Sequence, residues 1–114
     1  MALAIASREV DGVIVLDLSG RITLGEGSVQ LRDSIRDLIG KGQRRILLDL
    51  GDVNYIDSSG LGELVSAYTS ARNQGATVKL LKLTKKVHDL LQLTKLYTVF
   101  DVKDDEASAI ASFK

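Results

Sequence analysis

Hydrophobic and polar residues alternate over the first part of the chain, with a single interruption. Leu3 to Val10 and Val13 to Ser19 both have the pattern of strands, and apolar residues occupy every second position from Ile14 to Leu18. Asp11-Gly12 separates the two segments, and this dipeptide is typical of a two-residue type I′ turn. The pattern therefore predicts that the chain begins with an antiparallel hairpin.

The rest of the chain alternates between short apolar segments and segments with helical spacing. We expect a loop over 20–27, followed by a helix that Ser28 caps and that ends near residue 40. A strand over 46–50, a helix over 59–73 and a strand over 78–83 should come next. The chain should end with a helix capped by Thr84, a short strand over 99–102 and a helix over 104–113. Such alternation implies parallel strands joined by right-handed crossovers. The prediction is an α/β fold with a mixed sheet of four to five strands and about four flanking helices.

The turn after the strand at 46–50 has an unusual composition. Asp57 stands where an N-cap is expected, and Ser58 and Ser59 fall in the first helical turn, where unpaired N–H groups and the helix dipole favour negative charge. The two serines are therefore either plain capping residues or sites for an added phosphate. Gly60 and Gly62 each cost a helix about 1 kcal/mol relative to alanine. We expect both to be exposed, leaving bare backbone that a partner can approach closely.

The string Asp57-Ser58-Ser59-Gly60-Leu61-Gly62 resembles the signature of bacterial anti-sigma factor antagonists, which are single STAS domains. The similarity extends to Leu16–Gly20 and to Leu90–Phe100. The resemblance implies one STAS domain over residues 1–114, phosphorylated on Ser58 by a partner that is both an anti-sigma factor and a serine kinase. It implies that the unmodified chain binds this partner and frees the sigma factor, whereas the phosphorylated chain releases it. A reversible switch also calls for a phosphatase.

The predicted partner surface centres on the start of the helix at 59–73. Its residues are Asp57, Ser58, Ser59, Gly60, Leu61 and Gly62, bordered by Arg21 and Thr23 of the preceding loop. The family usually has acidic residues where this chain reads Arg21-Ile22-Thr23, so the chain departs from the family in that region. We expect Ser58 to project outward and Ser59 to turn toward the sheet or to bond to the backbone. We also expect Gly60→Val to weaken partner binding more than stability.

Composition narrows the possible functions. Fifteen basic and fifteen acidic residues give a formal net charge of zero, which argues against nucleic-acid binding. There is no cysteine, no apolar run long enough to span a membrane, and no basic region at the N-terminus of the kind that begins a signal peptide. A single domain in the cytoplasm is the expectation for a chain of 114 residues with this composition.

The same residues allow an enzyme, a metal site or a different binding module as alternatives. An enzyme would use Ser58 with His88 as its base, but the chain has neither a G-x-S-x-G elbow nor a Walker A loop. Asp49, Asp52 and Asp57 do not have the spacing of metal ligands. No catalysis, cofactor or metal is therefore predicted. The alternative function is a STAS-like module that binds a small ligand or a lipid-transport partner without kinase control.

Overall fold

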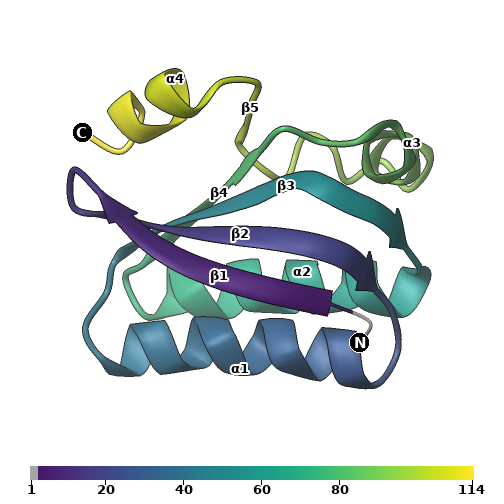
Figure 1. Ribbon diagram of the computed structural model, residues 1–114, viewed down its shortest axis with the longest axis horizontal. Helices are drawn as coiled ribbons and strands as arrows, with labels where there is room; N and C mark the ends of the chain where they lie inside the picture. The colour runs from purple at the N-terminus through teal and green to yellow at the C-terminus, as the bar shows by residue number, and fades with distance from the viewer. Residues whose placement is uncertain (1–2) are drawn as a thin grey trace.

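The computed structural model describes residues 3–114 and contains a five-stranded mixed sheet with helices on both faces (Figure 1). The elements, in chain order, are β1 (Leu3–Val10), β2 (Val13–Ile22), α1 (Glu26–Gly40), β3 (Arg45–Ile56), α2 (Ser58–Asn73), β4 (Thr77–Leu81), α3 (Lys85–Leu93), β5 (Val102–Lys103) and α4 (Glu106–Ala111). The strands are ordered β1-β2-β3-β4-β5; β1 is antiparallel to β2, and the other pairs are parallel. The predicted fold class is confirmed.

Helices α1 and α2 lie side by side on one face of the sheet, whereas α3 and α4 lie at opposite ends of the other face (Figure 1). The main core lies between the sheet and the first pair of helices, and α3 adds Val87 and Leu91 to it. A smaller cluster on the other face packs Ala109 and Ile110 of α4 against β2, β3 and β4. None of the helices in residues 3–114 combines the length and the apolar character that a membrane crossing requires. Met1 and Ala2, which belong to the segment predicted to lack a signal peptide, lie outside the described residues.

Local sequence signals account for several element boundaries. Asp11 and Gly12 both have positive φ, 50° and 80°, as the predicted type I′ turn requires. Thr84 caps α3 as predicted, with its hydroxyl oxygen accepting the N–H of Val87, and the same hydroxyl donates to the Val53 carbonyl at 2.7 Å. The hairpin and this cap were therefore correctly predicted from neighbouring residues.

Other boundaries differ from the prediction. Helix α1 begins at Glu26 after a Gly25 with φ of 94°, so Ser28 is not its cap; the buried Ser28 hydroxyl donates instead to the Thr23 carbonyl at 2.7 Å. Strand β4 ends at Leu81 because Lys82 has a left-handed φ of 56°. The last strand begins at Val102, because the segment from residue 94 to 99 forms hydrogen-bonded turns, and α4 begins at Glu106, because the Asp105 side chain caps it by accepting the Ser108 N–H; both elements are shorter than predicted.

A charged cluster fastens α4 to the sheet. The Arg8 guanidinium on β1 lies 2.7 Å from an oxygen of Asp17 on β2, and it also donates to both carboxylate oxygens of Glu106 at the start of α4. These hydrogen bonds lower the pKa of both carboxyl groups below their ordinary values. The cluster thus joins residues that are far apart in the sequence.

Candidate partner-binding site

Asp57 connects the start of α2 to the loop that follows β2. Its backbone is extended, with φ of −102° and ψ of −179°, and one carboxylate oxygen accepts the Gly60 N–H at 2.7 Å. The other oxygen accepts the Leu24 N–H at 3.3 Å, and the Asp57 N–H donates to the Ile22 carbonyl at 3.3 Å. The predicted N-cap is confirmed, and the same side chain also positions the loop after β2 beside the helix.

Ser58 and Ser59 form the first turn of α2, and both are exposed. Within residues 3–114, neither hydroxyl nor either backbone N–H of this pair makes a hydrogen bond to the protein. Ser58 projects outward as expected, but Ser59 neither turns toward the sheet nor bonds to the backbone, so the expectation for Ser59 is wrong. Two free hydroxyls therefore stand at the positive end of a 16-residue helix.

The two glycines of α2 have different environments. Gly60 is buried, and a Cβ added to it would lie 2.0 Å from the carbonyl oxygen of Ile22 on β2. The expectation of an exposed Gly60, whose replacement by valine affects binding rather than stability, is therefore contradicted: a glycine is needed here for α2 to approach β2. Gly62 is exposed, and a Cβ there would meet no atom within 4 Å.

The exposed part of the predicted surface thus contains only some of the residues from Asp57 to Gly62. Leu61 is only 4% exposed and belongs to the main core, so it lies with Gly60 behind the surface that Ser58, Ser59 and Gly62 present. The structure brings the exposed Arg21 and the half-buried Thr23 to the same edge of the sheet. Arg21 lies in β2 and not in the predicted loop, and its pairing with Tyr55 positions it, whereas the contact between Asp57 and Leu24 holds the loop that contains Thr23.

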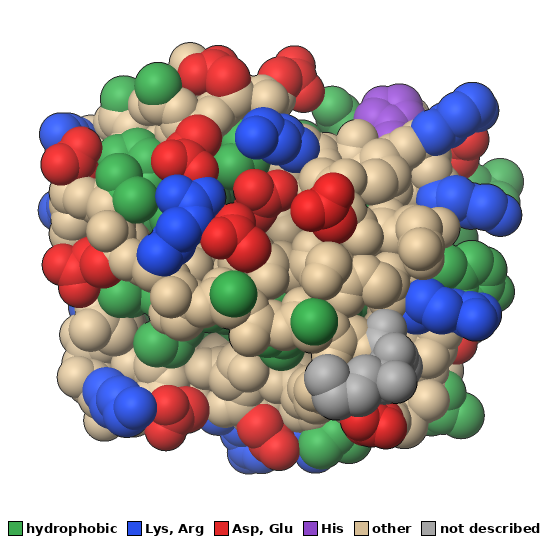
Figure 2. Space-filling model, in the orientation of Figure 1, with side chains coloured by type: hydrophobic (Ala, Val, Ile, Leu, Met, Phe, Trp, Pro, Cys, Tyr) green, Lys and Arg blue, Asp and Glu red, His purple; other side chains and the backbone are tan. Residues whose placement is uncertain are grey.

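The surface predicted from the sequence included Arg21 but missed three neighbouring residues, Leu24, Tyr55 and Lys86. Leu24 is 77% exposed, although its N–H contacts the cap of α2. Arg21 and Lys86 both lie over the ring of Tyr55, with their charged groups 4.8 Å and 5.7 Å from its centroid. Figure 2 shows basic and hydrophobic side chains together along the edge where β2 and β3 end in Figure 1. Parallel pairing sets Arg21 beside Tyr55, but Arg21 was expected in a loop and the strand was expected to end at residue 50, whereas β2 continues to Ile22 and β3 to Ile56, so this neighbourhood was not predicted.

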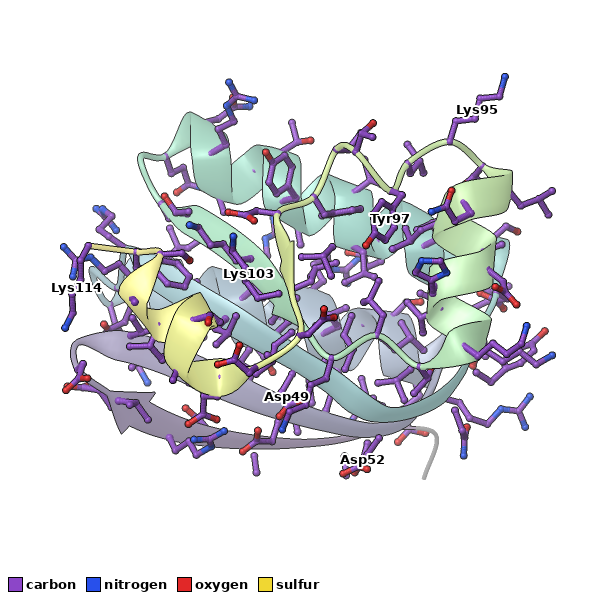
Figure 3. All side chains as sticks on the ribbon, turned by 90° about the horizontal axis from the view of Figure 1, so that it is seen from above. Asp49, Asp52, Lys95, Tyr97, Lys103 and Lys114 are labelled. Carbon is purple, nitrogen blue, oxygen red and sulfur yellow. The ribbon has the colours of Figure 1, made fainter. Side chains whose placement is uncertain are left out.

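The residues that an enzyme or a metal site would use make other contacts in the structure. His88 packs edge-on against Tyr97, with ring centroids 5.0 Å apart, and its Nδ1 lies 3.7 Å from Asp89. Figure 3 shows Asp49 and Asp52 on the sheet face that α3 and α4 partly cover. One Asp49 oxygen accepts the Gly51 N–H at 3.0 Å. Across residues 3–114 there is no cluster of three side chains of the types that hold a metal ion.

Residues 4–109 match the model of the STAS domain family. The match covers nearly the whole chain, which therefore belongs to this family. The chain is similar to BtrV of Bordetella bronchiseptica, which is provisionally described as an anti-sigma factor antagonist. The identity is 27% over 93% of this chain and 90% of the relative. It is also similar to the anti-sigma F factor antagonist of Paenibacillus polymyxa, with 27% identity over 100% of this chain and 97% of the relative.

A solved structure agrees with the family assignment. The crystal structure of a Thermotoga maritima protein, provisionally described as an anti-sigma factor antagonist, superposes on this structure with a TM-score of 0.86 and 28% sequence identity. The match covers 95% of this chain and 92% of that one. The five-stranded sheet and its four helices are thus the arrangement of a known STAS domain structure.

Proposed function

We propose that this chain is a cytoplasmic anti-sigma factor antagonist that is switched off by phosphorylation of Ser58. In its unmodified form it binds an anti-sigma factor that has serine kinase activity, and a sigma factor is thereby freed for transcription. Phosphorylation by that kinase releases the antagonist, and a phosphatase resets it. The family membership and the names of the full-length relatives support this function.

The position of Ser58 is the observation that carries the proposal. Ser58 is the first residue of α2, it is exposed, and the carboxylate of the neighbouring Asp57 is already engaged by the N–H groups of Gly60 and Leu24. The Ser58 hydroxyl is therefore open to a kinase. A phosphate on it would lie where free N–H groups and the helix dipole favour an anion, so the fold should tolerate the modification.

The choice between the two serines rests on the family motif. Ser58 and Ser59 are both exposed, so burial does not distinguish them. The motif assigns the phosphate to the first serine of the pair. Two variants that each remove one hydroxyl, Ser58→Ala and Ser59→Ala, form a matched test because both positions are in the first turn of the same helix.

The test is a phosphorylation assay with a candidate serine kinase of the anti-sigma factor class. The protein is incubated with the kinase and ATP, and its intact mass and fragment masses are then measured. The proposal expects one added phosphate on Ser58, the same addition in Ser59→Ala, and none in Ser58→Ala. Phosphate found on Ser59, or equally in both variants, contradicts the assignment.

A further inference from the structure

The edge beside Ser58 carries two cations that share one aromatic ring. The Arg21 guanidinium at the end of β2 lies 4.8 Å from the centroid of Tyr55, and the Lys86 ammonium in the first turn of α3 lies 5.7 Å from it. Tyr55 belongs to β3 and pairs with Arg21 in parallel register. Arg21, Tyr55 and Lys86 are termed the cationic platform below.

The charges of the cationic platform are not neutralised by the protein. Arg21 and Lys86 are both exposed, and within residues 3–114 neither has a carboxylate oxygen within 4.0 Å. The adjacent Lys85, by contrast, is paired with Asp89 at 2.9 Å. The ring quadrupole of Tyr55 attracts both cations, and this attraction holds two like charges close together. Their hydrogen-bond donors remain available to a ligand.

We infer that the cationic platform binds an acidic segment of the protein partner, through carboxylates that contact Arg21 and Lys86. A guanidinium forms paired hydrogen bonds to a carboxylate, and a neighbouring ammonium adds a second point of attraction. Leu24, 77% exposed on the same edge, offers an apolar contact beside these charges. The chain as a whole has no net charge, so the attraction to an acidic segment comes from these two local cations and not from an overall positive charge. The identity of the partner as an anti-sigma factor rests on the proposed function.

The platform also gives phosphorylation a physical means of action. Tyr55 lies near the end of β3 and precedes Ser58, the first residue of α2, by three residues, so a phosphate on Ser58 would enter the field of the platform. It would repel the carboxylates of a bound acidic segment and partly neutralise Arg21 and Lys86. Both effects weaken the same contact.

The binding chemistry can be tested without any identified partner. ¹⁵N-labelled protein is titrated with hexaglutamate, with hexalysine as the control peptide. The test variant is Arg21→Glu/Lys86→Glu. The matched control is Arg45→Glu/Lys95→Glu, which makes the same change in net charge at two exposed positions outside the platform. Circular dichroism verifies that both variants are folded.

We expect hexaglutamate, and not hexalysine, to produce saturable shifts of the Arg21, Tyr55 and Lys86 amides. The dissociation constant should rise about tenfold or more in the platform variant and less than about threefold in the control, since two direct charge contacts are lost only in the former. Absence of saturable shifts at these amides, or an equal loss in both variants, would overturn the inference. So would a thymidine hexanucleotide that binds the platform more tightly than hexaglutamate.

This result is separable from the proposed function. The peptide titration involves neither a kinase nor Ser58 phosphorylation. If hexaglutamate fails to bind while the kinase modifies Ser58, the platform inference is wrong and the proposed function stands. If hexaglutamate binds the platform and the kinase does not modify Ser58, the platform inference stands and the proposed function is wrong.

Discussion

Replacing Gly60 with alanine should destabilise the protein because the new methyl group meets the backbone of β2. The added Cβ would lie 2.0 Å from the Ile22 carbonyl oxygen and 2.8 Å from its carbonyl carbon. Ordinary carbon–oxygen contacts are near 3.3 Å, so the start of α2 must move by about 1 Å or more. That movement strains the Asp57 N–H···Ile22 hydrogen bond, which is already 3.3 Å long.

The size of the effect follows from two opposing contributions. Overpacking against a backbone that cannot rotate away costs about 3 kcal/mol, whereas alanine gains about 1 kcal/mol over glycine in helix propensity. The net loss of about 2 kcal/mol corresponds to a fall of about 8 °C in Tm for a domain of this size. Gly62→Ala is the matched control, because its Cβ meets no atom within 4 Å, and it should gain up to about 1 kcal/mol.

The assay is thermal and urea unfolding followed by far-ultraviolet circular dichroism. We expect the Tm of Gly60→Ala to lie about 10 °C below that of Gly62→Ala, with wild type between them. Equal stability of the two variants would refute the argument that close packing of β2 against α2 requires a glycine at position 60.

Three further predictions concern the surface, the cap and the fastening of α4. Gly62→Leu should not lower the free energy of unfolding, since leucine has the higher helix propensity, and should reduce affinity for the anti-sigma factor about tenfold, measured by calorimetry, because the side chain projects from the exposed first turns of α2; unchanged affinity contradicts the proposed face. Asp57→Ala should lower the free energy of unfolding by about 1 kcal/mol, measured by urea titration, because α2 loses its cap; no loss would contradict this role. The pKa of Glu106 is lowered by Arg8, so its stabilisation is present above the ordinary carboxyl pKa and is lost as the pH falls through the folded-state value. Glu106→Gln should therefore cost at most about 1 kcal/mol at pH 7 and nothing near pH 2, because the pair is partly exposed; an equal cost at both pH values would contradict the ion-pair explanation.

The sequence was most informative where neighbouring residues determine the geometry. Asp11-Gly12 specifies its turn by the positive φ of both residues, and Asp57 and Thr84 cap helices whose first N–H groups lie within three residues of them. Periodicity also assigned the strands and helices of an α/β sheet, because burial on one face repeats with the period of each element.

Contacts between distant segments could not be predicted in the same way. The buried position of Gly60 depends on the path of Ile22, and the hydrogen bonds from Arg8 to Glu106 span most of the chain. Ser28 has the residue type of a cap, yet its hydroxyl satisfies the Thr23 carbonyl because the helix starts earlier. The position of Lys86 over Tyr55 likewise requires α3 to be placed against β3.

The most direct test of the central claim compares the affinity of the anti-sigma factor for unmodified and Ser58-phosphorylated protein by isothermal titration calorimetry. A phosphate carries nearly two negative charges, and one repulsive pair at about 5 Å with an effective dielectric of 20 costs about 3 kcal/mol. We therefore predict at least about a hundredfold loss of affinity, with an unchanged circular dichroism spectrum. Equal affinity of the two forms, or loss of the fold on phosphorylation, would contradict the proposed switch.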